Sequence, residues 1–127
     1  MRRYLPILGL AIAVSSCGKD VSLPKTFEGA WDLETAACAD PESLSGLRVT
    51  SRRLQFYEST GDLIRTTGSD DGVTDIELDW TDASVTAPGG LPLTERKVSR
   101  LSLSEDQSRL SILIDDENWT YVRCPGE

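Results

Sequence analysis

The chain of 127 residues contains no histidine. Histidine is the commonest general base and a frequent metal ligand, so its absence excludes Ser-His-Asp triads, Cys-His pairs and zinc sites built on imidazole. No other nucleophile stands beside a recognisable base, and no pair of carboxylates is singled out for glycoside chemistry. We therefore predict a protein that is not an enzyme, with no catalytic residue, no metal and no cofactor.

Basic residues are scarce. The chain has 13 lysines and arginines against 21 acidic residues, which gives a net charge of -8. Its first 16 residues hold Arg2 and Arg3 and no acid, so a chain without them carries 11 bases against 21 acids, or -10. Binding to nucleic acid or to anionic lipid surfaces needs a basic patch. We predict no nucleic-acid partner and interpret the acidity as a source of solubility.

Long apolar runs are missing, with one exception at residues 5–14. Ten helical residues span about 15 Å, half of a bilayer core, which is too short for a transmembrane helix. Arg2 and Arg3 precede this run, and two serines and Cys17 follow it. This arrangement is typical of a signal peptide, here residues 1–16, that is removed after export. Cys17 is then either a site of modification after cleavage or an incidental cysteine that follows an ordinary signal peptide.

Residues 14–17, Val-Ser-Ser-Cys, resemble the lipobox of bacterial lipoproteins. The resemblance implies that the Cys17 thiol receives a diacylglycerol, that cleavage occurs just before Cys17, and that the new amine is acylated. Several acyl chains make a stable membrane anchor. Gly18 is not the aspartate that retains family members in the inner membrane, so the resemblance implies an outer-membrane lipoprotein that faces the periplasm. Residues 17–26 are predicted to form the lipidated tether.

Cysteine is limited to three residues. With Cys17 assigned to lipid, Cys38 and Cys124 are an even pair in an oxidising compartment, and we predict a disulfide bond between them. It would join the segment after the first strand to the last strand. Free thiols and a metal site are the alternatives, but two cysteines without a histidine make a poor metal site.

A helical apolar period is also absent. From Phe27 on, apolar and polar residues alternate in short runs separated by turn signals. In the first run Phe27, Trp31 and Leu33 share one face, and Asp32 lies on the other. A hairpin turn is expected at residues 60–62. About eight such strands over residues 27–127 predict an all-β domain, a small antiparallel β-barrel, because closure removes exposed edges. A sandwich is the alternative.

The residues Gly29, Ala30 and Trp31 resemble the Gly-x-Trp mark of lipocalin-type barrels. In that family an arginine near the last strand packs over the tryptophan, and Arg123 is the residue here that matches it. The resemblance implies a lipocalin-like barrel in which Trp31 and Arg123 form a closing pair, with a cation–π contact of about 0.5–2 kcal/mol. The alternative is that Trp31 is simply a core residue. The sequence leaves open whether the barrel encloses a cavity.

Together these features predict a non-enzymatic binding protein of the cell envelope. Its partners would be the membrane, through the lipid anchor, and either a small apolar ligand or an envelope protein. The alternative is an inhibitor of a periplasmic hydrolase, a protease or a lysozyme. The Gly-x-Trp start, single disulfide and short barrel also resemble small periplasmic protease inhibitors, which insert an extended N-terminal segment, here residues 18–26. The acidic stretch at Asp70, Asp71, Asp75 and Glu77 is interpreted as a solvated loop, because its spacing does not fit an EF-hand.

Overall fold

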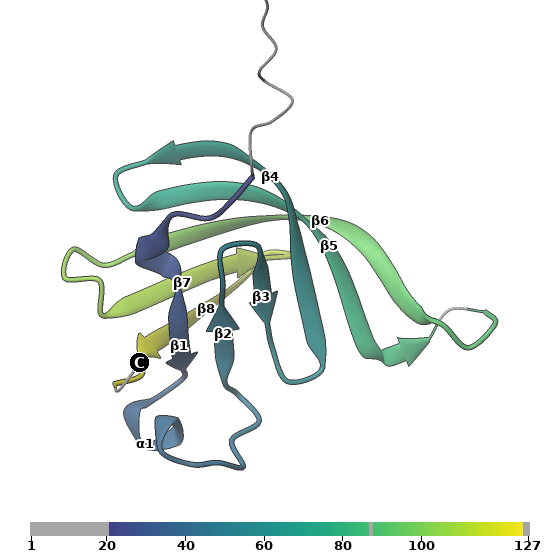
Figure 1. The fold of residues 1–127 in the computed structure, drawn as a ribbon, viewed down its shortest axis with the longest axis horizontal. Helices are drawn as coiled ribbons and strands as arrows, with labels where there is room; N and C mark the ends of the chain where they lie inside the picture. Colours follow the sequence, from purple (N-terminus) through teal and green to yellow (C-terminus); the bar gives the residue numbers. More distant parts are fainter. Residues whose placement is uncertain (1–20, 87, 126–127) are drawn as a thin grey trace, which may run out of the picture.

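The computed structural model describes residues 21–86 and 88–125 (Figure 1). A 3-10 helix, Lys25–Phe27, precedes the first strand, and a short helix α1, Thr35–Cys38, follows it. The strands are β1 (Gly29–Asp32), β2 (Leu47–Val49), β3 (Arg53–Gln55), β4 (Ser59–Asp70), β5 (Val73–Thr86), β6 (Pro92–Leu103), β7 (Arg109–Ile114) and β8 (Glu117–Arg123). In this described part of the chain, no helix is long and apolar enough to cross a bilayer.

The strands form a closed barrel in which each strand pairs antiparallel with the next, and β8 returns to pair with β1. The predicted fold class is therefore confirmed: the domain is an all-β barrel of eight antiparallel strands, and it is not a sandwich. In a barrel of this up-and-down kind, alternate turns gather at the same end. The turns that follow β1, β3, β5 and β7 lie at one end, and those that follow β2, β4 and β6 lie at the other.

Side chains that alternate along the strands fill part of the barrel. Leu54, Ile76, Leu78, Leu101 and Leu110 have no exposed surface. These residues come from β3, β5, β6 and β7, so the core joins strands from around the whole barrel. The period-two pattern predicted this inward face, because successive strand residues point to opposite sides of a sheet.

Residues 21–27 cover one end of the barrel, which we call the closed end. Leu23 and Phe27 are buried at 3% and 1% exposure, and the Leu23 amide donates to the Ser51 carbonyl in the turn after β2 (2.7 Å). The folded domain therefore begins before Phe27, within the segment that the sequence analysis placed in the tether. The apolar side chains of this segment pack against the barrel, whereas a polar linker would have none to bury.

The turn predicted at residues 60–62 lies instead inside β4, and the chain reverses at residues 56–58. Gly61 faces Leu54 on one neighbouring strand and Trp80 on the other. A Cβ atom at this position would lie 3.1 Å from the Leu78 side chain and 3.4 Å from the Trp80 ring. Gly61 is thus required by close packing across strands, and it does not mark a turn.

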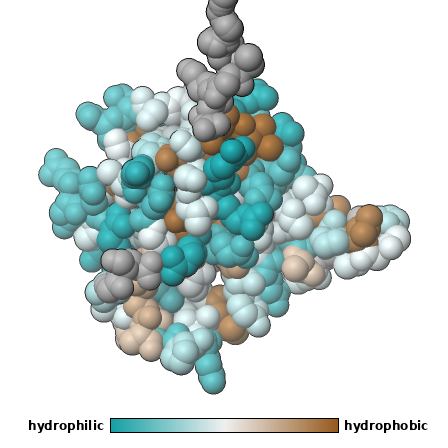
Figure 2. Space-filling view, in the orientation of Figure 1, coloured by the Kyte–Doolittle hydropathy of each residue, from teal (hydrophilic) through white to brown (hydrophobic). Residues whose placement is uncertain are grey.

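β5 and β6 run beyond the strands beside them, β4 and β7. β5 and β6 pair from Val73 with Ser102 to Thr86 with Pro92, and their hairpin projects from the barrel (Figure 1). Residues 84–86, at the end of β5, belong to this projecting part. In Figure 2 this projection is white and brown, whereas the barrel body is mostly teal. Leu91 near its tip is 70% exposed.

Candidate functional site

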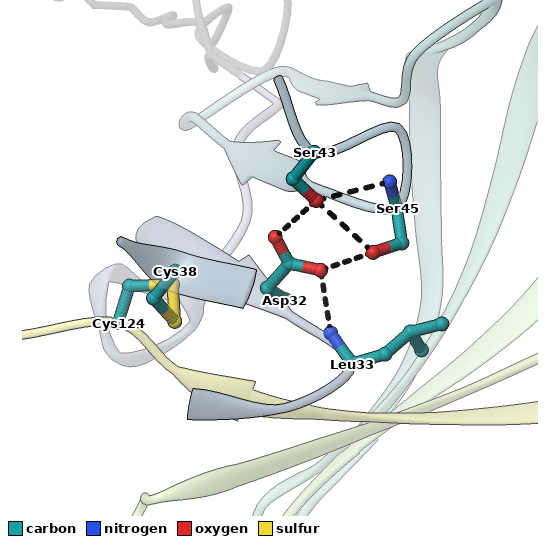
Figure 3. The surroundings of a disulfide bond; sticks show 6 residues. All are labelled: Asp32, Leu33, Cys38, Ser43, Ser45 and Cys124. Carbon is teal, nitrogen blue, oxygen red and sulfur yellow. Dashed lines mark hydrogen bonds between the residues drawn. A yellow bond between two sulfur atoms is a disulfide. The ribbon is translucent and has the colours of Figure 1, made fainter. Parts of the chain in front are cut away.

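The predicted disulfide is present and joins Cys38, at the end of α1, to Cys124, just after β8 (Figure 3). The two cysteines are 86 residues apart in sequence, and the Cys124 amide donates to the Ala30 carbonyl of β1 (2.8 Å). The bond thus fastens the first helix to the seam between the first and last strands. Cys17 and the signal segment 1–16 lie outside the described residues.

Trp31 and Arg123 face each other where β1 pairs with β8. The guanidinium carbon of Arg123 lies 4.2 Å from the centre of the Trp31 ring, and Trp31 is buried. Arg123 also donates to the carbonyls of Thr26 (2.7 Å), Glu28 (2.9 Å) and Gln107 (3.0 Å). Trp31 Nε1 donates to the Phe27 carbonyl (3.0 Å). The pair therefore holds residues 25–28 against the seam, which is a structural role at the closed end.

The opposite end of the barrel, which we call the open end, contains a pocket of about 390 Å³. Apolar and aromatic side chains predominate in its lining. The lining residues are Leu33, Leu44, Ser45, Gly46, Phe56, Tyr57, Ser59, Trp80, Lys97, Ile112, Ile114, Asp115, Glu117, Trp119 and Tyr121. A volume of this size falls in the range of small-molecule sites, which are mostly apolar with a few placed polar groups.

The floor of the pocket is aromatic. The rings of Phe56 and Trp80 have centroids 5.3 Å apart, and those of Phe56 and Tyr121 are 6.5 Å apart, both pairs being tilted. Such geometry is favourable for aromatic pairs and fixes the rings relative to one another. Burial and the negative charge of Asp32 raise the pKa of Tyr121 to about 12, so its phenol is neutral. The floor is therefore a preformed, uncharged surface.

The mouth of the pocket exposes large apolar side chains. Leu44 is 65% exposed, Tyr57 60%, Trp119 47% and Leu33 41%. They come from three chain segments that meet at the open end, namely the connection from β1 to β2, the turn after β3, and β8. Isolated apolar residues on a surface are ordinary, but a cluster around a cavity is typical of an interaction site.

Asp32 explains why this mouth stays open. It is buried, although the alternation predicted an outward side chain, and Leu33 lies at the pocket mouth where a core position was predicted. The Asp32 carboxylate accepts hydrogen bonds from the Ser45 hydroxyl, the Ser43 hydroxyl (2.8 Å) and the Leu33 amide (2.7 Å), as Figure 3 shows. β1 ends here, so the period of two ends as well.

The same hydrogen bonds set the charge of Asp32. Burial alone raises its pKa, but the donors from Ser45, Leu33 and Ser43 outweigh that effect and hold the pKa below the usual 3.8. An ionised carboxylate therefore fastens residues 43–45 beside β1. Leu44, between the two serines, is presented at the mouth as a result.

Lys97 is the cationic residue of the pocket lining. Its ammonium donates to the Asp115 carboxylate, lies 3.9 Å from Glu95 and is 6.0 Å from the Trp80 ring centre. The hydrogen bond to Asp115 is the largest cause of a raised Lys97 pKa. Asp115 and Glu95 carry two negative charges against the one positive charge of Lys97, so this group of three residues has a net negative charge.

The acidic residues on β4 and β5 do not converge on one point. Asp75 pairs with Arg100 (2.7 Å), and Glu77 lies 3.5 Å from both Arg65 and Arg96. Asp70 and Asp71 are exposed beside the turn after β4. Among residues 21–86 and 88–125, no group of three or more acidic or cysteine side chains is placed to hold a metal ion. These carboxylates form surface ion pairs and a solvated turn.

Alternation with Leu54 and with Leu78 indicates inward positions for Phe56 and Trp80, but it does not identify Leu44, Tyr57 or Trp119 as their neighbours. Tyr57 lies in the turn after β3, and Trp119 lies near the turn after β7. Both turns follow odd-numbered strands, which end together in an up-and-down barrel. Aromatic residues beside alternate turns are the signal that could have located this pocket.

Comparison of the chain with protein-family models, with curated proteins and with solved structures finds no match.

Proposed function

We propose that this protein is a lipid-anchored protein of the cell envelope that binds an apolar ligand group in its open-end pocket without catalysing a reaction. The observation that carries the proposal is the aromatic pocket of about 390 Å³ with an apolar mouth. The anchor at Cys17, the outer-membrane location and the periplasmic orientation rest on the lipobox-like sequence before the domain.

The pocket supports binding because its walls are fixed in advance. Its floor is continuous with the barrel core through Ile112, Ile114 and Tyr121, which are 1%, 8% and 6% exposed. Its mouth is held by the Asp32 network and by the disulfide nearby. A ligand therefore does not have to order the site before it binds, and removal of its apolar surface from water favours the complex.

A photoreactive probe tests the binding proposal. The full chain in phosphatidylcholine nanodiscs is irradiated with a neutral benzophenone, with and without excess naphthalene, and the attachment sites are mapped by mass spectrometry. We expect attachment beside Tyr57, Trp80 and Trp119, and protection by naphthalene. Leu44→Ala at the mouth should lower the labelling several-fold.

Leu91→Ala is the matched control, because Leu91 is exposed to a similar degree as Leu44 (70% against 65%) but lies near the tip of the hairpin. It should leave the labelling unchanged. Equal loss in both variants, or labelling concentrated at residues 88–93, would contradict a pocket-specific site.

The anchor has its own test. Cells that express the chain are grown with labelled palmitate, and incorporation is compared between the unmodified chain and Cys17→Ser. We expect labelling of the unmodified chain alone. If Cys17→Ser is still labelled, the lipid is attached elsewhere and the proposed anchor is wrong.

Inhibition of a periplasmic hydrolase is a second candidate, and the projecting β5–β6 hairpin favours it. Residues 83–94 contain no charged side chain, and Leu91 is 70% exposed. The N-terminal mode of inhibition is disfavoured for residues 21–27, because this segment packs on the barrel. Titration of lysozyme and of trypsin with the chain tests the candidate: stoichiometric inhibition that Leu91→Asp abolishes would support it, and undiminished activity would remove it for both enzymes.

A further inference from the structure

Half of strand β6 has a partner on one side only. β7 pairs with β6 from Ser99 to Leu103, and no described strand pairs with the same side of β6 over residues 92–98. On its other side β6 is paired with β5 through most of this stretch. An unpaired edge of this length is a template for another extended chain.

Two hydrogen bonds identify which backbone groups face this edge. The Leu103 amide donates to the Gly72 carbonyl, just before β5, and the Ser104 amide donates to the Arg109 carbonyl on β7 (2.9 and 3.0 Å). Because backbone groups alternate in direction along a strand, even-numbered residues of β6 face the β7 side. Thr94, Arg96 and Val98 therefore direct their N–H and C=O groups to the edge. Within the described chain these groups pair neither with β7 nor with a backbone group of a turn or loop.

The edge is hollowed on both sides. A groove of about 660 Å³ runs along residues 95–100 of β6 and is bounded by Leu113, Asp115 and Asp116 at the end of β7. Lys97 and Asp115 line both this groove and the aromatic pocket. A chain added to the edge would thus lie directly beside the mouth of the pocket.

The side chains of β6 alternate in a way that suits such an addition. Arg96 faces the outer surface, where it pairs with Asp79, and Lys97 faces the pocket. A strand added in the same sheet would alternate likewise, so every second side chain would point to the pocket side. One bulky apolar side chain could then reach the aromatic floor while the backbone stays on the edge.

The charges beside the edge select the partner. The pocket and the groove together are lined by three cations, Arg96, Lys97 and Arg100, and by five carboxylates, Asp75, Glu95, Asp115, Asp116 and Glu117, so their combined lining carries a net charge of -2. Complementary charge speeds association and sets specificity more than it sets affinity. A partner with basic side chains next to its apolar anchor fits this mouth, and an acidic one does not.

We propose that an extended peptide segment adds to the free edge of β6 and places one bulky apolar side chain, flanked by basic residues, in the aromatic pocket. This inference rests on the proposed binding function and names its ligand class. Peptide recognition by strand addition takes affinity from the backbone and specificity from pockets for alternate side chains. A second copy of the chain fits less well, because its charge is -8 and the pocket-facing residues 93, 95 and 97 of its own edge include only one apolar side chain.

The test uses a fluorescent seven-residue peptide of threonines with tryptophan at its fourth position and lysine at its second and sixth. Its binding to the full chain in phosphatidylcholine nanodiscs is measured by fluorescence anisotropy, with empty nanodiscs as the blank. We expect saturable binding. Replacement of its tryptophan by alanine, of its lysines by glutamates, or of its backbone N–H groups by N-methyl groups should each lower the affinity at least tenfold.

A variant pair tests the edge itself. Arg96→Pro removes an N–H that points to the free edge of β6, a position where an edge strand tolerates proline. The variant should lower peptide affinity at least tenfold. Arg96→Ala removes the same ion pairs, to Asp79 and Glu77, but keeps the N–H, and it should change affinity less than twofold. If Arg96→Pro no longer takes the benzophenone probe, it has not folded, and the N-methylated peptide on the unmodified chain decides.

The outcomes separate the two proposals. Probe labelling without peptide binding, or peptide binding that ignores N-methylation, overturns strand addition and leaves the pocket function intact. Absence of both probe and peptide binding overturns both. Sedimentation that shows a dimer for the unmodified chain and a monomer for Arg96→Pro assigns the edge to a second copy and overturns the peptide.

Discussion

The two ends of the barrel are built from the same strands but differ in how their apolar side chains are covered. At the closed end Leu23, Phe27 and Trp31 are at most 3% exposed, and Arg123 satisfies three backbone carbonyls. At the open end Leu33, Leu44, Tyr57 and Trp119 are between 41% and 65% exposed around a pocket. The difference teaches that one end of this small barrel buries its apolar side chains, whereas the other leaves them exposed around a pocket, where we propose that a ligand binds.

The cause of the difference lies in two chain segments. Residues 21–27 fold back over the closed end, where their apolar side chains are buried. The long connection from β1 to β2 could have covered the open end in the same way. Instead Asp32 draws Ser43 and Ser45 to the side of β1, so the connection borders the pocket and does not fill it.

The largest effect is expected from Trp31→Ala at the closed end. The variant leaves a large cavity in a site with 1% exposure and should lower the free energy of unfolding by about 3–5 kcal/mol. Denaturant unfolding of the variant and the unmodified chain measures the loss. A loss below about 1 kcal/mol would show that the closed end is not the stabilising part of the barrel.

Removal of the disulfide should follow in size. Cys38→Ser with Cys124→Ser opens a loop that closes over 86 residues, and we expect a loss of about 2–5 kcal/mol. Unfolding with and without reductant gives the same comparison in the unmodified chain. Thiol titration of the denatured, unreduced chain should detect neither Cys38 nor Cys124, and two reactive thiols from this pair would contradict the bond.

Arg123→Ala should have an intermediate effect. It removes the cation over Trp31 and three hydrogen bonds to carbonyls, so we expect a loss of about 1–3 kcal/mol. Arg123→Lys keeps the charge but not the planar fork of donors, and it should recover only part of that loss. Arg96→Ala, which breaks an exposed ion pair, is the control and should change stability by less than about 1 kcal/mol.

Acid should act on the open end through Asp32. The folded pKa of Asp32 lies below 3.8, so its stabilising contribution is present above that pH and is lost as the pH falls through the folded pKa. Stability of the unmodified chain should therefore decline more steeply with acid than that of Asp32→Asn. Unfolding midpoints of both chains, measured from about pH 5 down to about pH 3, test this. Parallel profiles for the two chains would contradict it.

The smallest stability effect is expected from Trp119→Ala at the mouth. With 47% of its surface exposed, the side chain contributes little to the core, and the loss should stay below about 1 kcal/mol. Benzophenone labelling of the pocket should nevertheless fall clearly. A large loss of stability with unchanged labelling would reverse the roles that the comparison assigns to the two ends.

Much of the barrel could be predicted because its signals are local. The inward positions of β7, Leu110, Ile112 and Ile114, follow from alternation within six residues. The disulfide followed from the number of cysteines. Gly61 was misread as a turn, since the side chains that require a glycine there, Leu78 and Trp80, lie on a strand distant in sequence.

The pocket could be predicted only in part. Phe56 and Trp80 have inward positions that alternation indicates. Leu33 and Asp32 exchange their expected sides, because β1 ends at Asp32 and hydrogen bonds from Ser43 and Ser45 repay its burial. Alternation of apolar and polar residues does not predict side-chain direction beyond the end of a strand. It also does not reveal hydrogen-bond partners that lie eleven and thirteen residues away, as Ser43 and Ser45 do from Asp32.

By itself the sequence determined the class of this domain: short alternating strands without histidine or a helical period, and two cysteines available for one bond. Only the tertiary structure decided which end of the barrel is filled, where β6 runs past its neighbour, and which carboxylate is buried. The physical reason is range. Alternation and turn chemistry act between residues a few positions apart, whereas a cavity and an unpaired edge depend on the unequal lengths of strands that meet only in the folded chain.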